Sequence, residues 1–445
     1  VSNGTFEPGL DGWVLQGNHV ASGLNTGEGF SSSRSLHLRA SAGGDNGANR
    51  IKIKLTSGFS NGQTVTLRAK ARWLAGQTNL LLRLKGNYLE AVGALPPPVN
   101  LGTPGAPNSR AVVNAGPAIH SVAHTPVLPT GGQAVQVVAQ VHDPDGLASL
   151  QLVYRADPST NLNIVSMVYN GAGFYSATIP GQSSGTLVAF HIRATDAHAS
   201  APATSRFPDD APARECLVRF GESSPAGTFG VYRLWMTQAN INTWAAREKL
   251  SNEAMDGTFV YGNSRVVYNA GGRYRGSPFI RPGYNSPIGN LCAYVWTMPK
   301  DDAVLGTDEF NLDTLEPGRD NTRQREKTSF WIAEQLGVPF SYQRYVHLYV
   351  NGFKRGDIYA DSQQPNSDFI RSWFPNDDRG EIFKIDDWFE FNASVSMEFN
   401  VDATLQNFTT TGGAKKQARY RWNWEKKSNR GRDADYTRLS ALVDA

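Results

Sequence analysis

Cysteines, long apolar runs and net charge are all scarce in this sequence of 445 residues. The two cysteines, Cys216 and Cys292, are too few for a disulfide framework or a thiolate zinc site, and their spacing leaves open whether they pair. No apolar run approaches the roughly 18 residues that a membrane-spanning helix needs. The net charge of +3 is too small to indicate nucleic acid or an anionic membrane as a partner. We therefore expect a protein without transmembrane segments and without a nucleic-acid partner.

Glycine and proline, in contrast, are plentiful, with 44 and 24 copies, many of them between short alternating runs. This pattern predicts a mostly β fold, and the length predicts several domains. The chain opens at Val1 without a signal peptide, and the helical pattern at its end stops at Ala445 without a cap. We therefore expect a piece of a longer protein.

Residues 1–95 contain short alternating runs bounded by Gly, Asn and Ser, which predict an antiparallel β jelly roll. The opening phrase, with Phe6, Glu7, Gly9 and Trp13, resembles jelly-roll carbohydrate-binding modules. That resemblance implies weak sugar binding in which Trp13 and Trp73 stack on a sugar face. The alternative, which is the more common one for a tryptophan in a β-sandwich, is that both indoles belong to the core. Residues 96–115 are rich in Pro and Gly and predict a semi-rigid linker.

Residues 116–220 show strict alternation in "QAVQVVAQVHD" and again after an Asp-Pro-Asp-Gly turn. These runs resemble an immunoglobulin or fibronectin-type β-sandwich. Asp143 and Asp145 in the turn are candidate ligands for Ca²⁺ at a domain joint. The alternative is a turn that uses Asp and Gly for its backbone conformation alone.

Residues 221–445 mix helical and strand patterns, beginning with a helix that Thr237 should cap, and predict an α+β domain. Several phrases follow in a fixed order: "RYRGS", "YVWTMPKDD", "NTRQREKTSFWIAEQLGVP", "VHLYVNGFKRGDIYA" and "GEIFKID". In this order they resemble the spore coat protein CotH kinase-like family. Asn351-Gly352 should form a type I′ hairpin turn. The helical spacing of Phe330, Ala333 and Leu336 predicts that they face the sheet.

The resemblance implies a kinase small lobe and the start of a large lobe, with ATP and Mg²⁺ or Mn²⁺ as cofactors. The implied cofactor-binding residues are Arg275, Arg281, Glu326 and Lys384. Arg281 is the one cation in the interval between Ser277 and Met298, where the family carries a phosphate-binding Lys. The family's catalytic acids lie downstream of the last helix, so the sequence nominates no catalytic residue, and we expect this piece alone to be inactive.

Two hypotheses of different classes follow. The first is a secreted or cell-surface bacterial protein with a CotH-like atypical kinase domain that phosphorylates an extracellular protein. The second is a non-catalytic extracellular scaffold that binds surface glycans or mediates adhesion and keeps a degenerate kinase-like domain. The order of the family phrases favours the first hypothesis, and the missing Lys favours the second.

Overall fold

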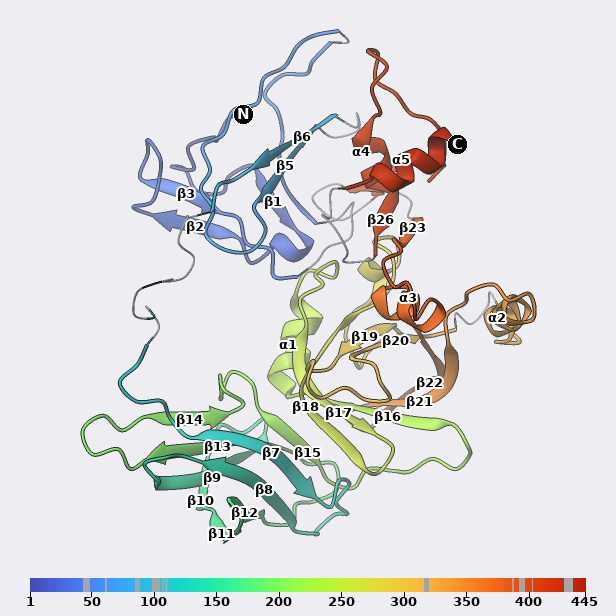
Figure 1. Ribbon diagram of the computed structural model, residues 1–445. Coiled ribbons are helices and arrows are strands. Elements are labelled where there is room, and N and C mark those ends of the chain that lie inside the picture. Colours follow the sequence, from blue (N-terminus) through green and yellow to red (C-terminus); the bar gives the residue numbers. More distant parts are fainter. Residues whose placement is uncertain are drawn as a thin grey trace.

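The computed structural model describes residues 1–42, 49–60, 62–84, 89–97, 105, 108, 111–315, 320–385, 388–391, 397–401, 403–427 and 435–445. The protein is mostly β and multi-sheet, which confirms the predicted fold class. A β-sandwich lies at one end, a barrel lies in the middle, and an N-terminal module and a C-terminal body lie side by side on the far side of the barrel (Figure 1). Among the described helices, none is long and apolar enough to cross a membrane.

The described part of the N-terminal module (residues 1–97) contains three two-stranded antiparallel sheets. They pair β1 (Trp13–Gln16) with β4 (Arg50–Ile53), β2 (Gly23–Thr26) with β3 (Arg34–His37), and β5 (Asn79–Leu84) with β6 (Leu89–Ala94). The short 3-10 helix η1 (Gly17–His19) follows β1. Residues 63–74, which include one of the alternating runs of the sequence, have no regular structure and are mostly exposed. The paired strands are β structure as expected, and their assembly into a jelly roll stays a prediction.

The sandwich has two antiparallel sheets. One contains β10 (Asn163–Ser166), β9 (Leu147–Asp157), β13 (Leu187–Asp196) and β14 (Thr204–Phe207), with β15 (Cys216–Arg219) also paired to β13. The other contains β11 (Val168–Gly171), β12 (Phe174–Ile179), β8 (Val135–His142) and β7 (Ala118–Thr125). Alternation along β8 sends Val135, Val137, Ala139 and Val141 into the core between the sheets. Its assignment to the immunoglobulin type stays a prediction.

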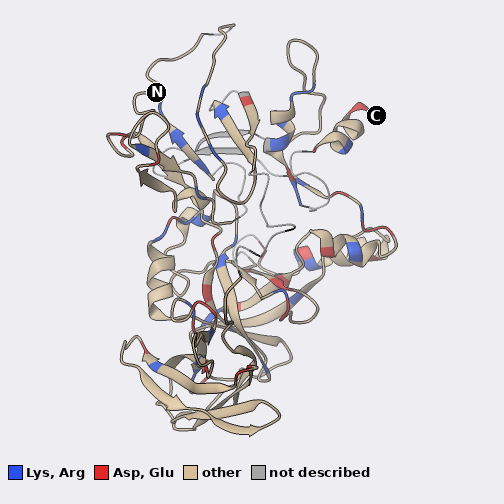
Figure 2. Ribbon diagram, turned by 60° about the vertical axis from the view of Figure 1, so that its left-hand side comes forward, with Lys and Arg blue, Asp and Glu red and all other residues tan. Residues whose placement is uncertain are grey.

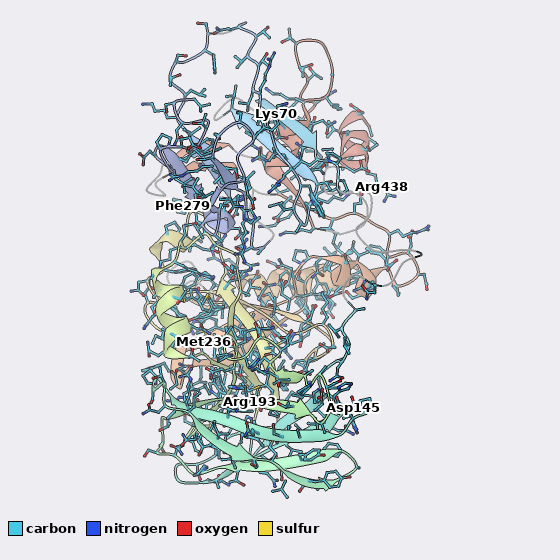
Figure 3. All side chains as sticks on the ribbon, turned by 90° about the vertical axis from the view of Figure 1, so that its left-hand side faces the viewer. Lys70, Asp145, Arg193, Met236, Phe279 and Arg438 are labelled. Atoms are coloured by element: carbon cyan, nitrogen blue, oxygen red, sulfur yellow. The ribbon has the colours of Figure 1, made fainter. Side chains whose placement is uncertain are left out.

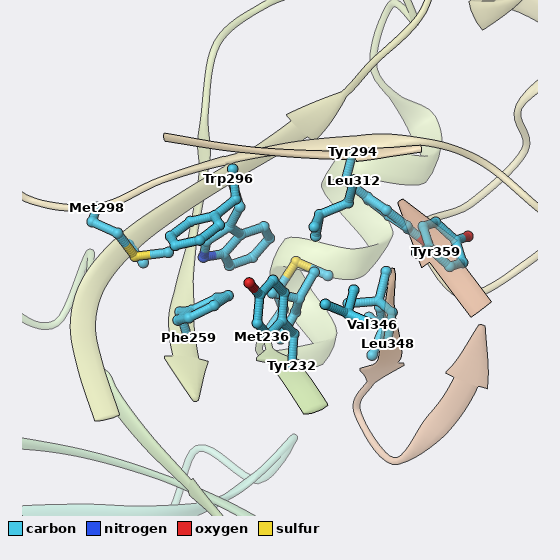
Figure 4. Close-up of a cluster of buried hydrophobic side chains, with 14 of the residues drawn as sticks. Tyr232, Met236, Phe259, Tyr294, Trp296, Met298, Leu312, Val346, Leu348 and Tyr359 are labelled. Atoms are coloured by element: carbon cyan, nitrogen blue, oxygen red, sulfur yellow. The ribbon is translucent and has the colours of Figure 1, made fainter. Parts of the chain in front are cut away.

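The barrel is a closed sheet of seven strands rather than a small-lobe sheet flanked by a helix. Its strand order is β16 (Gly230–Trp235), β17 (Met255–Tyr261), β18 (Arg265–Tyr274), β19 (Tyr294–Thr297), β20 (Glu309–Asp313), β22 (Phe353–Ser362) and β21 (Gln343–Val350). Parallel pairing of β16 with β21 closes the ring. Aromatic and aliphatic side chains fill its interior, so it is a packed core (Figure 4).

Helices around the barrel match the sequence only in part. Helix α1 (Gln238–Ala246) is capped by Thr237 as predicted, because the Thr237 side chain accepts a hydrogen bond from the Asn240 backbone N–H. Helix α2 (Arg325–Gln335) buries none of its side chains, and Leu336 just beyond it is 72% exposed. The prediction that Leu336 faces the sheet is therefore wrong. Phe330 and Ala333 are half-buried, and the Phe330 ring lies 6.3 Å from that of Phe340, so for these two the prediction stays a prediction.

The C-terminal body comprises the described part of residues 383–445, and α3 (Ser367–Trp373) connects it to the barrel. Its elements are β23 (Phe383–Ile385), β24 (Trp388–Phe391), β25 (Met397–Val401), α4 (Gln417–Asn423), β26 (Trp424–Lys426) and α5 (Thr437–Asp444). β23 pairs with β26, and β24 pairs with β25. A small apolar cluster holds α4, β26 and α5 together; it contains Tyr420, Trp424, Tyr436 and Leu439.

The sandwich and the barrel share a buried interface. Leu187 and Leu217 of the sandwich pack with Trp235 and Val260 of the barrel. Tyr268 of β18 reaches into the sandwich core itself. Because these side chains complete each other's cores, the sandwich and the barrel form one packed unit. The two cysteines are both buried and free, one in each part of this unit.

Candidate functional site

A row of side chains crosses the outside of the barrel from β18 to β21. Strand pairing places Arg273, Val295, Asn311, Ser362 and Gln343 directly opposite one another on five successive strands. Their chain neighbours, such as Tyr274, Phe310 and Leu312, are in the interior core, so alternation directs this row outward. We call these five residues the outer row. At the usual strand spacing it is about 19 Å long.

The outer row is polar, yet most of it is buried. Val295, Asn311 and Gln343 are each only 2–3% exposed although they face away from the barrel interior. Figure 1 places α3, β23 and β26 next to this end of the barrel. The row therefore lies at the junction between the barrel and the elements that follow it in the chain.

Hydrogen bonds connect the outer row to α2. Asn311 Nδ2 donates to the Ser362 backbone oxygen at 3.2 Å and to Gln364 Oε1 at 2.8 Å. Gln343 Nε2 donates to Ser362 Oγ at 3.2 Å and to the carboxylate of Glu326 on α2. These bonds fix the orientation of both amides, because a backbone carbonyl and a carboxylate can only accept.

Three buried acceptor oxygens on this face have no hydrogen-bond partner among the described residues. They are Asn311 Oδ1, Gln343 Oε1 and Oε1 of Glu309, which lies two residues from Asn311 on the same side of β20. Leaving a buried acceptor unpaired costs about 1–3 kcal/mol, and native proteins rarely tolerate several together. The face is therefore suited to a ligand that donates hydrogen bonds from amino or hydroxyl groups.

Arg273 places a positive charge at the β18 end of the outer row. Burial lowers the pKa of Arg273, while the negative charges of Glu309 and Glu425 act in the opposite direction. Burial raises the pKa of Glu309, and Arg273 and Lys427 oppose that rise. Glu425 and Lys427 belong to the segment around β26 and form an ion pair at 2.8 Å. The barrel and the C-terminal body thus face each other here through complementary charges.

The four predicted cofactor-binding residues do not all lie at this face. Arg275 lies two residues beyond Arg273 and forms an ion pair with Asp313. Arg281 belongs to the short 3-10 helix η2 (Arg281–Gly283) and is 1% exposed, and burial lowers its pKa to about 10. Its Nη1 donates to Asn252 Oδ1 at 2.6 Å. Arg281 is thus held inside the protein rather than at the face.

Glu326 and Lys384 approach the face from separate elements and do not form an ion pair with each other. The Glu326 carboxylate is bonded to Gln343 of the outer row. Lys384 is on β23, directly opposite Glu425 of β26. The arrangement therefore places both near the barrel–body junction without the lysine–glutamate pair that a kinase small lobe contains.

The sugar-binding and metal-binding predictions fall elsewhere. Trp13 is half-buried, its Nε1 donates to the Asn3 oxygen at 2.7 Å, and its ring lies 5.2 Å from that of Phe6. Trp73 is also half-buried and donates to the Gly76 oxygen at 3.0 Å. Each indole is thus bonded within its own segment, and the sugar platform stays a prediction.

Asp145 lies in the sandwich, which is separated from the C-terminal body by the barrel (Figure 3), and Asp143 belongs to the same turn. The Asp145 backbone N–H donates to Asp143 Oδ1 at 2.8 Å, which is the hydrogen bond expected of a turn that needs Asp. Within the described ranges, no three His, Cys, Asp or Glu side chains gather closely enough to hold a metal ion. The geometry thus matches the turn alternative, and the described residues do not fit a metal site built by the protein alone.

Sequence reasoning misses most of this site. Arg273 belongs to a family phrase but is not among the predicted site residues, although strand alternation puts it on the same side as Arg275. The run "EFNLD" also indicates a polar outer face in the sequence, because its polar residues Glu309, Asn311 and Asp313 alternate with Phe310 and Leu312. Gln343 is the first residue of β21, and the sequence gives no comparable signal for it.

The fold and this face define a multidomain, mostly β protein in which a barrel meets a partly helical C-terminal body across a polar junction. Comparison with family models then identifies residues 297–445 as matching a family described as CotH kinase protein. The C-terminal third of the chain is therefore CotH-like, as its phrases predicted. The match includes Glu309, Asn311, Gln343, Glu326 and Lys384, and it leaves out β16–β18 with Arg273 and Arg275. No curated protein matches the chain.

Proposed function

We propose that this protein binds a nucleotide of the ATP type between the outer row of the barrel and its C-terminal body. The observation that carries the proposal is a set of three buried oxygens, on Glu309, Asn311 and Gln343, that have no hydrogen-bond partner among the described residues. They lie along a row that starts at the half-buried cation Arg273. Adenosine supplies amino and hydroxyl donors for such oxygens. Its phosphates supply the negative charge that a guanidinium binds well. The similarity of residues 297–445 to CotH kinase proteins supports the same ligand class.

In a complete kinase-like protein, the bound nucleotide would donate a phosphoryl group to a hydroxyl of an extracellular protein. The residues of this chain would contribute binding and orientation. Arg273 would lie against the phosphates, and the outer row would orient the nucleoside. A divalent cation, Mg²⁺ or Mn²⁺, would enter with the nucleotide and would neutralise phosphate charge. Secretion or display at the cell surface is part of this proposal.

The test is thermal unfolding of the chain with and without ATP and MgCl₂. A ligand that binds only the folded state raises the melting temperature in a saturable manner. Arg273→Gln should weaken apparent ATP affinity by about tenfold or more, since it removes a charge-assisted contact. Arg265→Gln is the matched control, because Arg265 is on the same strand but forms an exposed pair with Asp302.

An unchanged melting temperature at millimolar ATP would overturn nucleotide binding and leave the scaffold hypothesis. Equal affinity in Arg273→Gln and Arg265→Gln would place the nucleotide elsewhere. If Arg273→Gln unfolds, Gln343→Leu serves instead, because it removes an acceptor at the opposite end of the outer row. Circular dichroism of each variant confirms that the comparison is between folded proteins.

A further inference from the structure

The turn at η1 anchors the N-terminal module to the barrel. The Gly17 backbone N–H donates to Glu248 Oε2 at 2.5 Å, and the Asn252 backbone N–H donates to Asn18 Oδ1. Gly17 and Asn18 are both buried. Burial raises the pKa of Glu248, and the bond from Gly17 opposes that rise. Polar groups this well covered are not incidental surface contacts.

Asn18 is held rigidly on its own side of this contact. Its backbone N–H donates to Asn49 Oδ1 at 2.7 Å, and its Nδ2 donates to the Ala42 oxygen at 3.0 Å. Because Nδ2 is bonded within the module, Oδ1 is directed toward the barrel. The position of Asn252 therefore depends on the fold of the N-terminal module.

Asn252, whose position is fixed by Asn18, is also hydrogen-bonded to a residue of the candidate site. Its Oδ1 accepts from Arg273 Nη1 at 3.3 Å and from Arg281 Nη1 at 2.6 Å. One amide oxygen thus accepts from two guanidinium groups, of which that of Arg281 is buried and that of Arg273 is half-buried. Asn18, Asn252 and Arg273 form a continuous connection from the N-terminal module to the outer row.

The same module also contacts the C-terminal body. Glu90 of β6 forms an ion pair with Arg421 of α4, and its other oxygen pairs with Arg83 of β5 at 2.7 Å. The Glu90 side chain is 3% exposed, and burial lowers the pKa of Arg421. A pair this buried is costly to break, because each partner would remain a desolvated charge.

We propose that the N-terminal module is a clamp: it holds the C-terminal body over the outer row through Glu90 and positions Arg273 through Asn18 and Asn252. The sequence resemblance implies a sugar-binding role for this module, and the clamp is a separate role. The contacts join the module to the barrel beside Arg273 and to the C-terminal body, which lies next to it (Figure 1). Asn18 and Asn252 are positioning residues in this proposal. Only its nucleotide readout depends on the function proposed above.

The first test is hydrogen–deuterium exchange of the whole chain without nucleotide. Asn18→Ala should speed exchange about tenfold or more in residues 248–252 and 270–275, and Glu90→Gln should do so in residues 417–423, because each loses a tertiary contact. The matched controls are Asn25→Ala and Glu28→Gln, since Asn25 and Glu28 bond to each other and Glu28 pairs with Arg72, all at the module surface. Unchanged exchange in the distant segments of both test variants would overturn the clamp.

The second test separates positioning from general stability. With ATP and MgCl₂, Asn252→Ala should lose affinity about tenfold, while Asn252→Asp, which keeps an acceptor for Arg273, should retain it. Equal loss in both variants contradicts the positioning role. If the unaltered chain binds no ATP, the proposed function fails, and the exchange experiment still decides the clamp. If Asn18→Ala unfolds its module, Glu90→Gln alone decides.

Discussion

Asp256 of β17 is the buried carboxyl with the clearest consequence for stability. Its Oδ1 has no hydrogen-bond partner among the described residues, and burial raises its pKa to about 7. The backbone hydrogen bond from Glu215 and the charge of Arg214 oppose that rise, while the negative charge of Asp210 adds to it. A raised pKa means that the folded state binds the proton more tightly than the unfolded chain. Its contribution to stability is therefore greatest at low pH and is lost as pH rises toward 7.

Asp256→Asn, which stays neutral, should therefore be more stable than the unaltered chain above pH 7. The expected gain is about 2–4 kcal/mol there and should decline toward zero near pH 4, where both side chains are neutral. Guanidinium unfolding at pH 8, 6 and 5 measures the difference. Asp209→Asn is the control, because Asp209 is exposed beside the same Arg214. A difference that does not vary with pH would show that Asp256 is ionised throughout.

For single residues, the sequence does not predict which cation lies at the candidate site. The sequence singles out Arg281 because it is the one cation in its interval, yet the fold buries it and joins it to Asn252. Arg273 is the cation at the outer row, and its role depends on β19 pairing with β18 and β20 pairing with β19. Tertiary packing decides which cation faces a site. The stretch of sequence in which a cation occurs does not contain that information.

At the scale of elements, local signals are reliable where they determine backbone geometry. The turn between β21 and β22 has φ of 46° at Asn351 and 80° at Gly352, as a type I′ turn requires. The capped helix α1 and the alternating strands of the sandwich also form as expected. Helix α2 forms too, but its apolar spacing does not lead to burial. Periodicity predicts which face of a helix is apolar, not whether a partner covers it.

The β21–β22 turn allows a precise test. A Cβ at Gly352 would clash with the Arg219 guanidinium, which pairs with Glu222 at 3.0 Å. Gly262 also has positive φ in the turn after β17, but no heavy atom outside its own chain neighbours lies within 4 Å of the position that a Cβ would take there. Both Gly→Ala changes should cost about 1 kcal/mol from backbone strain. Gly352→Ala should cost about 1–3 kcal/mol more, because it displaces a partly buried ion pair.

Urea unfolding of the two variants supplies this comparison. Adding Arg219→Ala to each variant is the control, since it removes the clashing group. In that background the two glycine substitutions should cost the same. A Gly352→Ala variant no less stable than Gly262→Ala would show that Arg219 moves aside without loss.

Across the whole molecule, charged side chains are unevenly distributed, and apolar packing joins some parts more closely than others. Charged side chains are sparse on the outer sandwich strands and more frequent around the barrel and the parts beyond it (Figure 2). The sandwich is joined to the barrel by apolar packing through Tyr268 and Trp235. The domain boundary expected near residue 220 therefore separates segments of sequence that share one core. Sequence patterns mark where strands start and end, but they do not show which strands share a core.

We expect a fragment of residues 111–445 to unfold cooperatively and a fragment of residues 222–445 to aggregate. The shorter fragment exposes Tyr268, Trp235 and Val260, which the sandwich normally covers. A fragment of residues 297–445, the extent of the family match, lacks β16–β18 and should not fold. Size-exclusion chromatography and calorimetry distinguish these outcomes. A monomeric 222–445 fragment with an undiminished melting temperature would contradict the shared core.

The closure of the barrel also sets an order of events during synthesis. Gly230 of β16 pairs with Val346 of β21. The first strand of the ring can therefore pair on this side only after β21, a strand made much later, has been synthesised. Until the β21–β22 hairpin leaves the ribosome, β16 and β20 both present unpaired edges, which are prone to pairing with other chains. Such distant pairing also slows folding. The β21–β22 hairpin, which completes the ring, is thus the last part of the barrel to be synthesised. The yield of folded protein should depend on how quickly this hairpin is synthesised.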